Sequence, residues 1–392
     1  MKIAFTADLH LKTRIDTPYR YNALDYIVKK IKKINEINND RISYLIICGD
    51  LFDKDFQNYS DFDYFCKENE DFNFIVIPGN HDERLRSSFF SSNNIKVIDK
   101  IELVEFDGRQ ILFVPYNNNE SLSNSIAQFL NQRPSNQNSL NQNSQEEVNY
   151  ENNSILENFI LVTHANYIST NYDSGLNKYE DGLYMPFSIN MIKKYKIKKV
   201  ILGHIHKPGE YGNGIIYYPG SPSPIDITEE GKRSFIIYDT FNDNIERVFI
   251  DSDIIYLHGE IMVYPDPDEQ FDFVLRQIDR IIIDSGIDNE DLNKIILKLQ
   301  IIGFTADIKN LLDNIKNYLE AKQIKLYENL NMEQLYVISE NDDVRISLLE
   351  KFKKKLNQFN LNKIYIKGIK SDCNKDDILY EGLKIILGKK NN

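Results

Sequence analysis

The chain has 392 residues, which is long enough for a large core and for more than one domain. With 12% aromatic and 27% charged residues, its composition is that of a globular protein rather than a disordered one. The net charge of -12 argues against a strongly basic nucleic-acid binder that works by counterion release alone. Substrates that carry phosphate are not excluded, because bound divalent cations can reverse the electrostatics of a site.

Neither the apolar runs nor the cysteines indicate a membrane or an oxidising compartment. No apolar run approaches the ~20 residues that cross a bilayer, and Asp8 interrupts the amino terminus before the core of a signal peptide could form. Cys48, Cys66 and Cys373 form no spaced framework, and an odd count is typical of a reducing compartment. We therefore expect a cytoplasmic protein.

The first 80 or so residues alternate between short apolar runs and helical periodicity. Runs at 3–5, 42–48 and 74–77 predict buried strands. Between the first two runs, apolar residues at helical spacing predict a helix that packs one face on a sheet: Leu24, Ile27, Val28, Ile31 and Ile34. Its lysines suit solvent, and DNA contact is the less favoured alternative. This β-α-β-α-β order favours a sheet with helices on its faces.

The composition changes abruptly between residues 117 and 153, where Asn, Ser, Gln and Glu dominate. Such a segment buries too little apolar surface to order itself, so much of it is predicted to be a loop insertion. Apolar runs return at 159–162 and 200–202, and a lysine-rich helix end at 191–199 either is solvated or meets a phosphate backbone. We expect two hairpin-like strands, at 215–218 and 235–238, to close a second sheet.

The character of the chain shifts near residue 251. The segment 254–338 has no cluster of ligand-type residues, and it contains a strand-like run and a helical stretch, which predict a small α+β domain. Two amphipathic helices follow, and their apolar stripes either dock on the same chain or bind a partner. We therefore assign residues 1–250 to a first domain, 251–340 to a second domain and 341–392 to terminal helices.

Five of the six histidines lie just past an apolar run, as do the acidic residues of a fifth fragment. The fragments are Asp8-Leu9-His10, Gly49-Asp50-Leu51-Phe52-Asp53, Gly79-Asn80-His81-Asp82, Thr163-His164-Ala165 and Gly203-His204-Ile205-His206. A single histidine near a strand is more often structural, and the third fragment alone would suit a turn. The joint pattern at the carboxyl ends of strands predicts a metal site.

The donors in these fragments indicate the kind of metal site. Imidazole with carboxylate suits Mn²⁺, Fe²⁺ or Zn²⁺, and the absence of cysteine argues against a structural thiolate zinc site. Seven nitrogen and oxygen ligands are too many for one ion. With one carboxylate bridging, they suit two ions ~3.5–4 Å apart, a spacing used for in-line displacement at phosphorus. Such a pair can lower the pKa of a bridging water and neutralise charge on the phosphoryl oxygens.

In order and spacing, the five fragments resemble the motif set of the calcineurin-like metallophosphoesterase superfamily, over residues 8 to 206. The resemblance implies an α/β fold, a two-sheet αββα sandwich, that holds two divalent ions. One ion would have four ligands: Asp8, His10, Asp50 and His206. The other would share Asp50 and would add Asn80, His164 and His204.

The same resemblance assigns His81 and Asp82 to catalysis. His81 would stabilise the transition state or protonate the leaving oxygen. Asp82 and Asp53 would orient their neighbours. Some members carry a histidine where this chain has Asp53.

Further runs look like the SbcD-type nuclease subunits of DNA break repair: Phe5–Leu11, Gly203–Pro208, Pro219–Pro222 and Glu229–Gly231. That resemblance implies a manganese-dependent exonuclease on duplex ends and endonuclease on single strands. It also implies a capping domain that helps to select DNA, a homodimer through the catalytic domains, and terminal helices that bind the coiled coil of an SbcC-type ATPase.

Two other functions remain as alternatives. A phosphodiesterase or phosphatase for a small nucleotide would use the same site but would hardly need the last third of the chain. A metal-free scaffold on the same fold would be expected to have lost ligands such as Asp8 or His204, and both are present.

Overall fold

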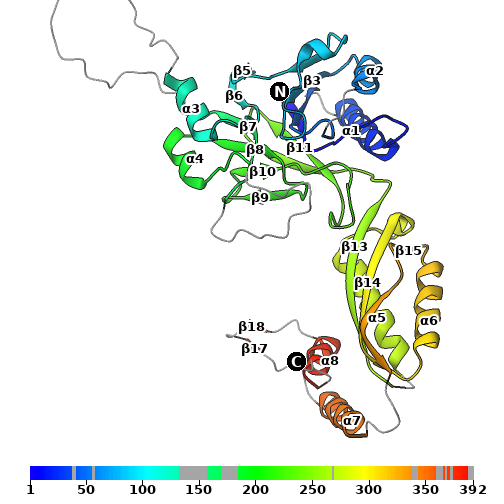
Figure 1. Cartoon of the computed structure of the whole chain (residues 1–392). Helices are drawn as coiled ribbons and strands as arrows, with labels where there is room; N and C mark the ends of the chain where they lie inside the picture. The colour runs from blue at the N-terminus through cyan, green and yellow to red at the C-terminus, as the bar shows by residue number, and fades with distance from the viewer. Residues whose placement is uncertain are drawn as a thin grey trace, which may run out of the picture. The chain divides into compact units, whose positions relative to one another are not determined.

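The computed structural model describes residues 1–37, 41–54, 58–131, 157–168, 184–266, 269–337, 343–358, 365–366, 369–370 and 374–386. The chain divides into two compact units, Met1–Asp253 and Ile254–Asn392 (Figure 1). Within the described ranges, every helix is too short or too polar to cross a membrane.

The first unit contains a six-stranded sheet in the order β12-β11-β1-β2-β3-β4. Its central strands are parallel: β1 (Lys2–Thr6), β2 (Ile42–Cys48), β3 (Asn73–Ile77) and β4 (Ile95–Val97). Helices α1 (Pro18–Ile37) and α2 (Ser60–Glu68) connect the first three strands. The predicted β-α-β-α-β order is therefore confirmed, and Leu24, Ile27 and Ile31 of α1 are buried as expected.

The second sheet of this unit has the order β5-β6-β7-β8-β10-β9. Its strands are β5 (Glu102–Phe106), β6 (Arg109–Val114), β7 (Ile160–His164), β8 (Lys199–Gly203), β9 (Gly209–Tyr211) and β10 (Ile216–Tyr218). Helices α3 (Leu122–Asn131) and α4 (Ile189–Tyr195) belong to the same half of the unit. A short 3-10 helix, η1 (Ser87–Phe89), lies between β3 and β4 in the chain.

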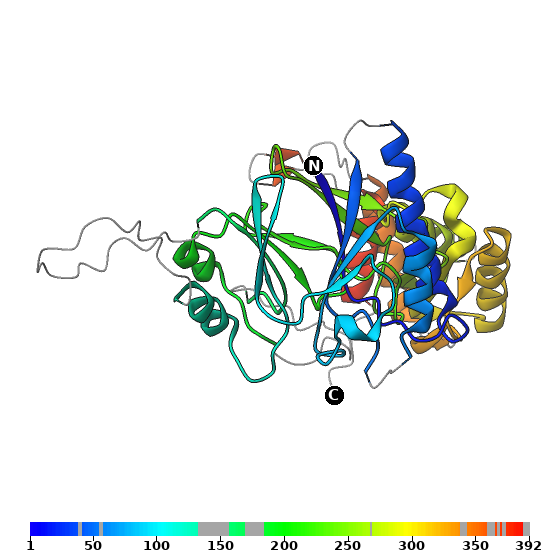
Figure 2. The ribbon, with the colours of Figure 1, turned by 90° about the horizontal axis from the view of Figure 1, so that it is seen from above.

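The two sheets pack face to face, with helices on both outer sides. Along β1, Ile3 and Phe5 enter the core between the sheets, whereas Ala4 faces the core beneath α1 and α2, as the two-residue period of a strand requires. A third core lies between the second sheet and α3 and α4. Seen from above, α1 and α2 (blue) lie on one side of the sheets, and α3 and α4 (teal and green) on the other (Figure 2). This is the αββα sandwich.

Two details differ from the sequence-based expectation. Residues 235–238 do not close the second sheet, because β11 (Ser234–Asp239) pairs antiparallel with β1 and with β12 (Ile245–Phe249) in the first sheet. The polar span 117–153, much of which was predicted to be a loop, contains helix α3, because Leu122 and Ile126 give that helix an apolar side that is buried on the second sheet. Its remainder from residue 132 lies outside the described residues.

The second unit alternates strands and helices more regularly than a general α+β arrangement. Strand β14 (Ile295–Thr305) pairs in parallel with β13 (Ile255–Val263), β15 (Lys325–Leu326) and β16 (Asn331–Val337). Helices α5 (Gln270–Asp284) and α6 (Ile308–Ala321) connect these strands, with a 3-10 helix, η2 (Asn289–Lys294), before β14. The parallel pairing of β13, β14 and β15 follows, since the connections from β13 to β14 and from β14 to β15 each cross over through a helix.

The terminal helices α7 (Asp343–Gln358) and α8 (Lys375–Ile386) pack on this unit, and a two-stranded pair, β17 (Tyr365–Ile366) and β18 (Ile369–Lys370), lies between them in the chain. Leu349 and Leu383 join a buried cluster with Phe273 of α5. The apolar inner faces of α7 and α8 therefore dock on the same chain. Leu348 and Ile385 remain exposed on the outer faces.

Candidate metal centre

The predicted ligands follow strands of both sheets. Asp8 and His10 come after β1, Asp50 after β2, and Asn80 after β3 of the first sheet. His164 ends β7 of the second sheet, and the last two follow β8: His204 and His206. The first two loops are tied together, because the backbone N–H of Asp8 donates to Gly49 and that of His10 donates to Asp50. The carboxyl ends of parallel strands from the two sheets therefore meet at one site.

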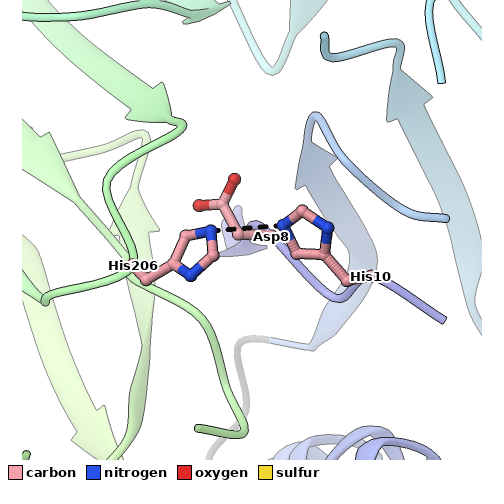
Figure 3. A group of neighbouring side chains, drawn as sticks. All are labelled: Asp8, His10 and His206. Carbon is pink, nitrogen blue, oxygen red and sulfur yellow. Dashed lines mark hydrogen bonds between the residues drawn. The ribbon is translucent and has the colours of Figure 1, made fainter. Parts of the chain in front are cut away.

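One group of ligand atoms comes from Asp8, His10 and His206 (Figure 3). Their three candidate ligand atoms lie within 4.8 Å of one another, and all three side chains are buried. The Nε2 atoms of His10 and His206 are 3.2 Å apart. Two nitrogens that bind one ion at about 2.1 Å each cannot lie more than about 4.2 Å apart, so this separation suits two ligands of a shared ion.

A second group surrounds His164. Its Nε2 lies 2.8 Å from Oδ1 of Asn80 and 3.3 Å from Oδ2 of Asp50. The same Asp50 oxygen is 3.7 Å from Nε2 of His10. The His204 ring packs edge-on against His164, with centroids 5.3 Å apart. Asp50 thus lies between the two groups, which is the position that a bridging carboxylate would occupy.

Neighbouring groups orient each ligand. The ring of His164 has Nδ1 3.0 Å from the carbonyl oxygen of Cys48, which only accepts, so the proton lies on Nδ1. Oδ1 of Asp8 accepts the backbone N–H of His204, and Oδ1 of Asp50 accepts that of His81. In each carboxylate one oxygen is held by the backbone, and the other is left to face the centre.

Buried polar atoms without a hydrogen-bond partner test whether a cation fits the centre. Oδ2 of Asp8 and both ring nitrogens of His204 are buried without a hydrogen-bond partner among the described residues. Buried polar groups are normally paired, because leaving one unpaired costs about 1–3 kcal/mol. A cation would satisfy Oδ2 of Asp8 and one ring nitrogen of His204, since a neutral imidazole offers a single lone pair. Imidazole, carboxylate and amide oxygen are the donors that Mn²⁺, Fe²⁺ and Zn²⁺ accept. The residues present therefore fit divalent ions.

The electrostatics of the centre agree with this fit. Burial raises the pKa of Asp8 to about 7. Burial alone would lower the pKa of His164, but the charges of Asp50 and Asp8 raise it to about 9. Burial lowers the pKa values of His10 and His204 well below their ordinary value. His10 and His204 are therefore neutral imidazoles, and the carboxylates around His164 favour a positive charge beside them.

Glycines give the ligand loops room to approach one another. A Cβ at Gly203 would overlap the carbonyl oxygen of Cys48 and crowd the ring of His164, and a Cβ at Gly79 would overlap the Asp50 carboxylate. Gly49 has a φ of +95°, which a side chain rarely tolerates. The glycine that precedes each of the motif residues Asp50, Asn80 and His204 is therefore required by the close packing of the centre.

The two residues assigned to catalysis lie in different environments. His81 is half-buried at the centre, with Nδ1 3.5 Å from Oδ1 of Asp53 and its ring edge-on to His10. Burial opposes protonation, but Asp53 outweighs it and raises the pKa of His81. Asp82 accepts the backbone N–H groups of Gly79 and Phe52 with its two oxygens, so its geometry ties two ligand loops together.

One residue at the centre was not predicted as a site residue. Oε1 of Glu229 lies 2.7 Å from Nδ1 of His206, and both side chains are buried. Sequence reasoning noted the turn at Glu229–Gly231 only as a feature of the nuclease resemblance. Two strands separate it from His206 in the chain, and no spacing rule connects an acid there to a histidine ligand.

Comparison with known families agrees with this geometry. A comparison with curated proteins finds no match. The family model of the calcineurin-like phosphoesterases matches residues 1–208, a span that contains all seven predicted ligands. Since the matched span is more than half of the 392 residues, the chain belongs to the calcineurin-like phosphoesterase family.

Proposed function

We propose that this metal-dependent phosphoesterase is a phosphodiesterase that acts on DNA, as an exonuclease on duplex ends and an endonuclease on single strands. The observation that carries the metal chemistry is the convergence of seven side chains from both sheets, with Asp50 between two groups. When bound, two divalent ions, with Mn²⁺ as the expected metal, activate a water and neutralise charge on the phosphate. We expect His81, whose ring lies edge-on to His10 and whose Nδ1 lies 3.5 Å from Oδ1 of Asp53, to give a proton to the leaving oxygen.

An aromatic stack beside the ligand loops supports a nucleic-acid substrate. Phe52, two residues after Asp50, packs edge-on against Tyr59, with centroids 4.9 Å apart. Tyr59 in turn stacks on Phe89, with centroids 5.0 Å apart and an angle of 6° between the rings. Phe89 is 43% exposed. An exposed ring at the end of such a stack can receive an unpaired base, because every base has an aromatic face.

Exposed cations follow three of the ligand motifs. Lys12 comes two residues after His10, Lys54 follows Asp53, and Arg84 comes two residues after Asp82. All three side chains are exposed. We expect these cations to attract the phosphates that flank a bound linkage, in a chain that is acidic as a whole. Nζ of Lys12 also lies 3.2 Å from Oδ2 of Asp53.

The partners belong to the same proposal. The resemblance to SbcD-type nucleases supports a role in DNA repair and recombination, a homodimer through the first unit, and an SbcC-type ATPase as partner. The exposed Leu348 of α7 and Ile385 of α8 are available for the coiled coil of that ATPase.

Incubation of the full-length protein with Mn²⁺ and end-labelled DNA tests the proposal. We expect cleavage of duplex ends and single strands, loss of cleavage with EDTA, and loss in His81→Ala. If bis-p-nitrophenyl phosphate is hydrolysed but DNA stays intact even with the ATPase present, a small-nucleotide phosphodiesterase replaces the nuclease. If the protein neither retains metal nor hydrolyses either substrate, the metal-dependent function is wrong.

The aromatic stack gives a second test that separates DNA binding from chemistry. Phe89→Ala should weaken binding of single-stranded DNA by about 5- to 150-fold, since a stacked base contributes about 1–3 kcal/mol. Hydrolysis of bis-p-nitrophenyl phosphate should stay unchanged. Phe241→Ala is the matched control, because Phe241 is 87% exposed in the turn between β11 and β12. Equal DNA affinity in both variants would exclude base stacking on Phe89.

A further inference from the structure

The segment 225–233 contacts the His206 ring through Glu229 and lies outside the span that matches the family model. Its Glu229 carboxylate meets Nδ1 of His206 at 2.7 Å, and both side chains are buried. A carboxylate accepts hydrogen bonds, so the proton of this bond lies on Nδ1. In a neutral imidazole, Nε2 then carries the free lone pair, and Nε2 is the atom that lies 3.2 Å from Nε2 of His10.

Glu229 is itself held by the rest of the segment. Its Oε2 accepts the backbone N–H of Ile225 at 3.2 Å and lies 3.6 Å from Nη1 of Arg233. Arg233 is fully buried and donates to three backbone carbonyl oxygens, those of His206, Glu229 and Glu230. A buried arginine is tolerated only when its donors are satisfied. The Glu229–Arg233 pair therefore holds His206 at two points, the ring and the backbone carbonyl.

We propose that Glu229 is a positioning residue that sets the tautomer and the ring orientation of His206 toward a divalent ion, and that Arg233 fixes Glu229 in place. Carboxylates that accept from a ligating histidine commonly have this role, and their loss typically weakens metal binding 10- to 100-fold. The inference rests on the proposed metal-dependent function, because it assigns His206 to an ion. It extends the metal centre beyond the matched family span, to the turn that precedes β11.

Titration of the metal-free full-length protein with Mn²⁺, followed by electron paramagnetic resonance, tests the role of Glu229. We expect two binding events in the wild type and a 10- to 100-fold weaker affinity for one of them in Glu229→Gln, with the other unchanged. Glu230→Gln, with an exposed side chain next in the chain, is the matched control and should bind as the wild type does. Unchanged affinities in Glu229→Gln would overturn the inference while leaving the metal-dependent function intact. A wild type that binds no Mn²⁺ would overturn both.

The tautomer of His206 can be measured without any change to Glu229. Nitrogen-15 NMR of the metal-free wild type, with the His206 signals assigned by their loss in His206→Gln, should show a protonated Nδ1 and an unprotonated Nε2. A proton on Nε2 with a bare Nδ1 would contradict the inference. A role of Glu229 in folding alone would lower the stability of Glu229→Gln and leave both Mn²⁺ affinities unchanged.

Discussion

Four residues of the metal centre have backbones in the left-handed region that favours glycine. The φ angles are 54° at Asp8, 45° at His10, 48° at Asp50 and 96° at His204. Such conformations cost about 1–3 kcal/mol each and persist where the surroundings hold them. Here the backbone N–H groups of Asp8 and His10 donate to the loop after β2, and that of His204 donates to Asp8. These hydrogen bonds hold the strained backbones in conformations that direct the four side chains toward one point.

His81 should affect the reaction without affecting metal content. Its side chain lies beside Asp53 and His10, and its backbone N–H donates to Oδ1 of Asp50. His81→Ala keeps that backbone bond, so we expect kcat for bis-p-nitrophenyl phosphate to fall by about 10²- to 10⁴-fold while the metal content stays the same. Activity assays with metal analysis check this, and His258→Ala in the second unit is the control. An unchanged kcat would remove His81 from the mechanism.

At the residue scale, the candidate ligands that could be predicted from the sequence are those in the five motif fragments that follow strands. Seven predicted ligands lie close together, although their role as ligands stays a prediction. Glu229 could not be found this way, because its contact with His206 depends on how β9, β10 and the following turn fold back. Asp82 is expected from the sequence to orient its neighbours, and its two oxygens accept the backbone N–H groups of Gly79 and Phe52, contacts that only side-chain geometry reveals.

At the scale of elements, the parallel strands β1, β2 and β3 were predictable because each is a short apolar run between helical or turn signals. The place of β11 was not predictable. Its alternating apolar residues suit either sheet, and pairing with β1 is a contact between residues more than 200 positions apart. Helix α3 was missed because its polar residues resemble the Asn-rich stretch that follows it.

Asp63 of α2 anchors the loop that carries the aromatic stack. Its carboxylate accepts from the backbone N–H groups of Ser91 and Ser92, from the Ser91 hydroxyl and from Lys67. Burial opposes ionisation, but these donors outweigh it and lower the pKa of Asp63. A lowered pKa contributes stability that is present above the unfolded value of about 3.9 and is lost as the pH falls below it.

Asp63→Asn should therefore destabilise the first unit by about 1–3 kcal/mol at neutral pH, since hydrogen bonds to a charged group are lost. The difference from the wild type should shrink as the pH falls below about 4, because the carboxyl of the unfolded wild type then becomes protonated and the ionised folded form loses its advantage. Urea denaturation at a series of pH values measures both effects. A difference that is constant from pH 7 to pH 3 would contradict the assignment.

Helix α8 should contribute to the stability of the second unit through its inner face. Leu383 is fully buried in a cluster with Met262 and Phe273, so Leu383→Ala should cost about 2–5 kcal/mol. Ile385, two residues away, is 82% exposed, and Ile385→Ala should change the free energy of unfolding by less than about 0.5 kcal/mol. Urea denaturation of both variants compares them. Equal stability would show that α8 does not dock on this unit.

At the scale of the whole molecule, the first unit contains both sheets, their three cores and all seven predicted ligands. The second unit has its own core around β13, β14, α5 and α6. The sequence indicated this division near residue 251, because the fragments with candidate ligands all precede that residue and a new pattern of strands and helices follows it. It did not indicate the parallel pairing of β13, β14 and β16 in the second unit, because strand direction follows from the crossovers and not from local periodicity.

This division predicts that chemistry and DNA selection can be separated. A chain that ends at Asp253 should fold and hydrolyse bis-p-nitrophenyl phosphate with Mn²⁺ at a rate close to that of the full protein. Its affinity for DNA should fall about tenfold or more, a difference of about 1.4 kcal/mol, if the second unit selects DNA. Fluorescence anisotropy with labelled duplexes measures this affinity. Full DNA affinity in the shortened chain would assign DNA selection to the first unit alone.

The central claim is that buried carboxylate, amide and imidazole groups from two sheets hold a pair of divalent ions. Anomalous diffraction at the manganese edge from crystals soaked in Mn²⁺ tests it most directly. The account predicts two peaks about 3.5–4 Å apart on either side of Asp50, one near Nε2 of His10 and one near Nε2 of His164. A map with no peak among these side chains, or with manganese only elsewhere on the protein, would contradict it.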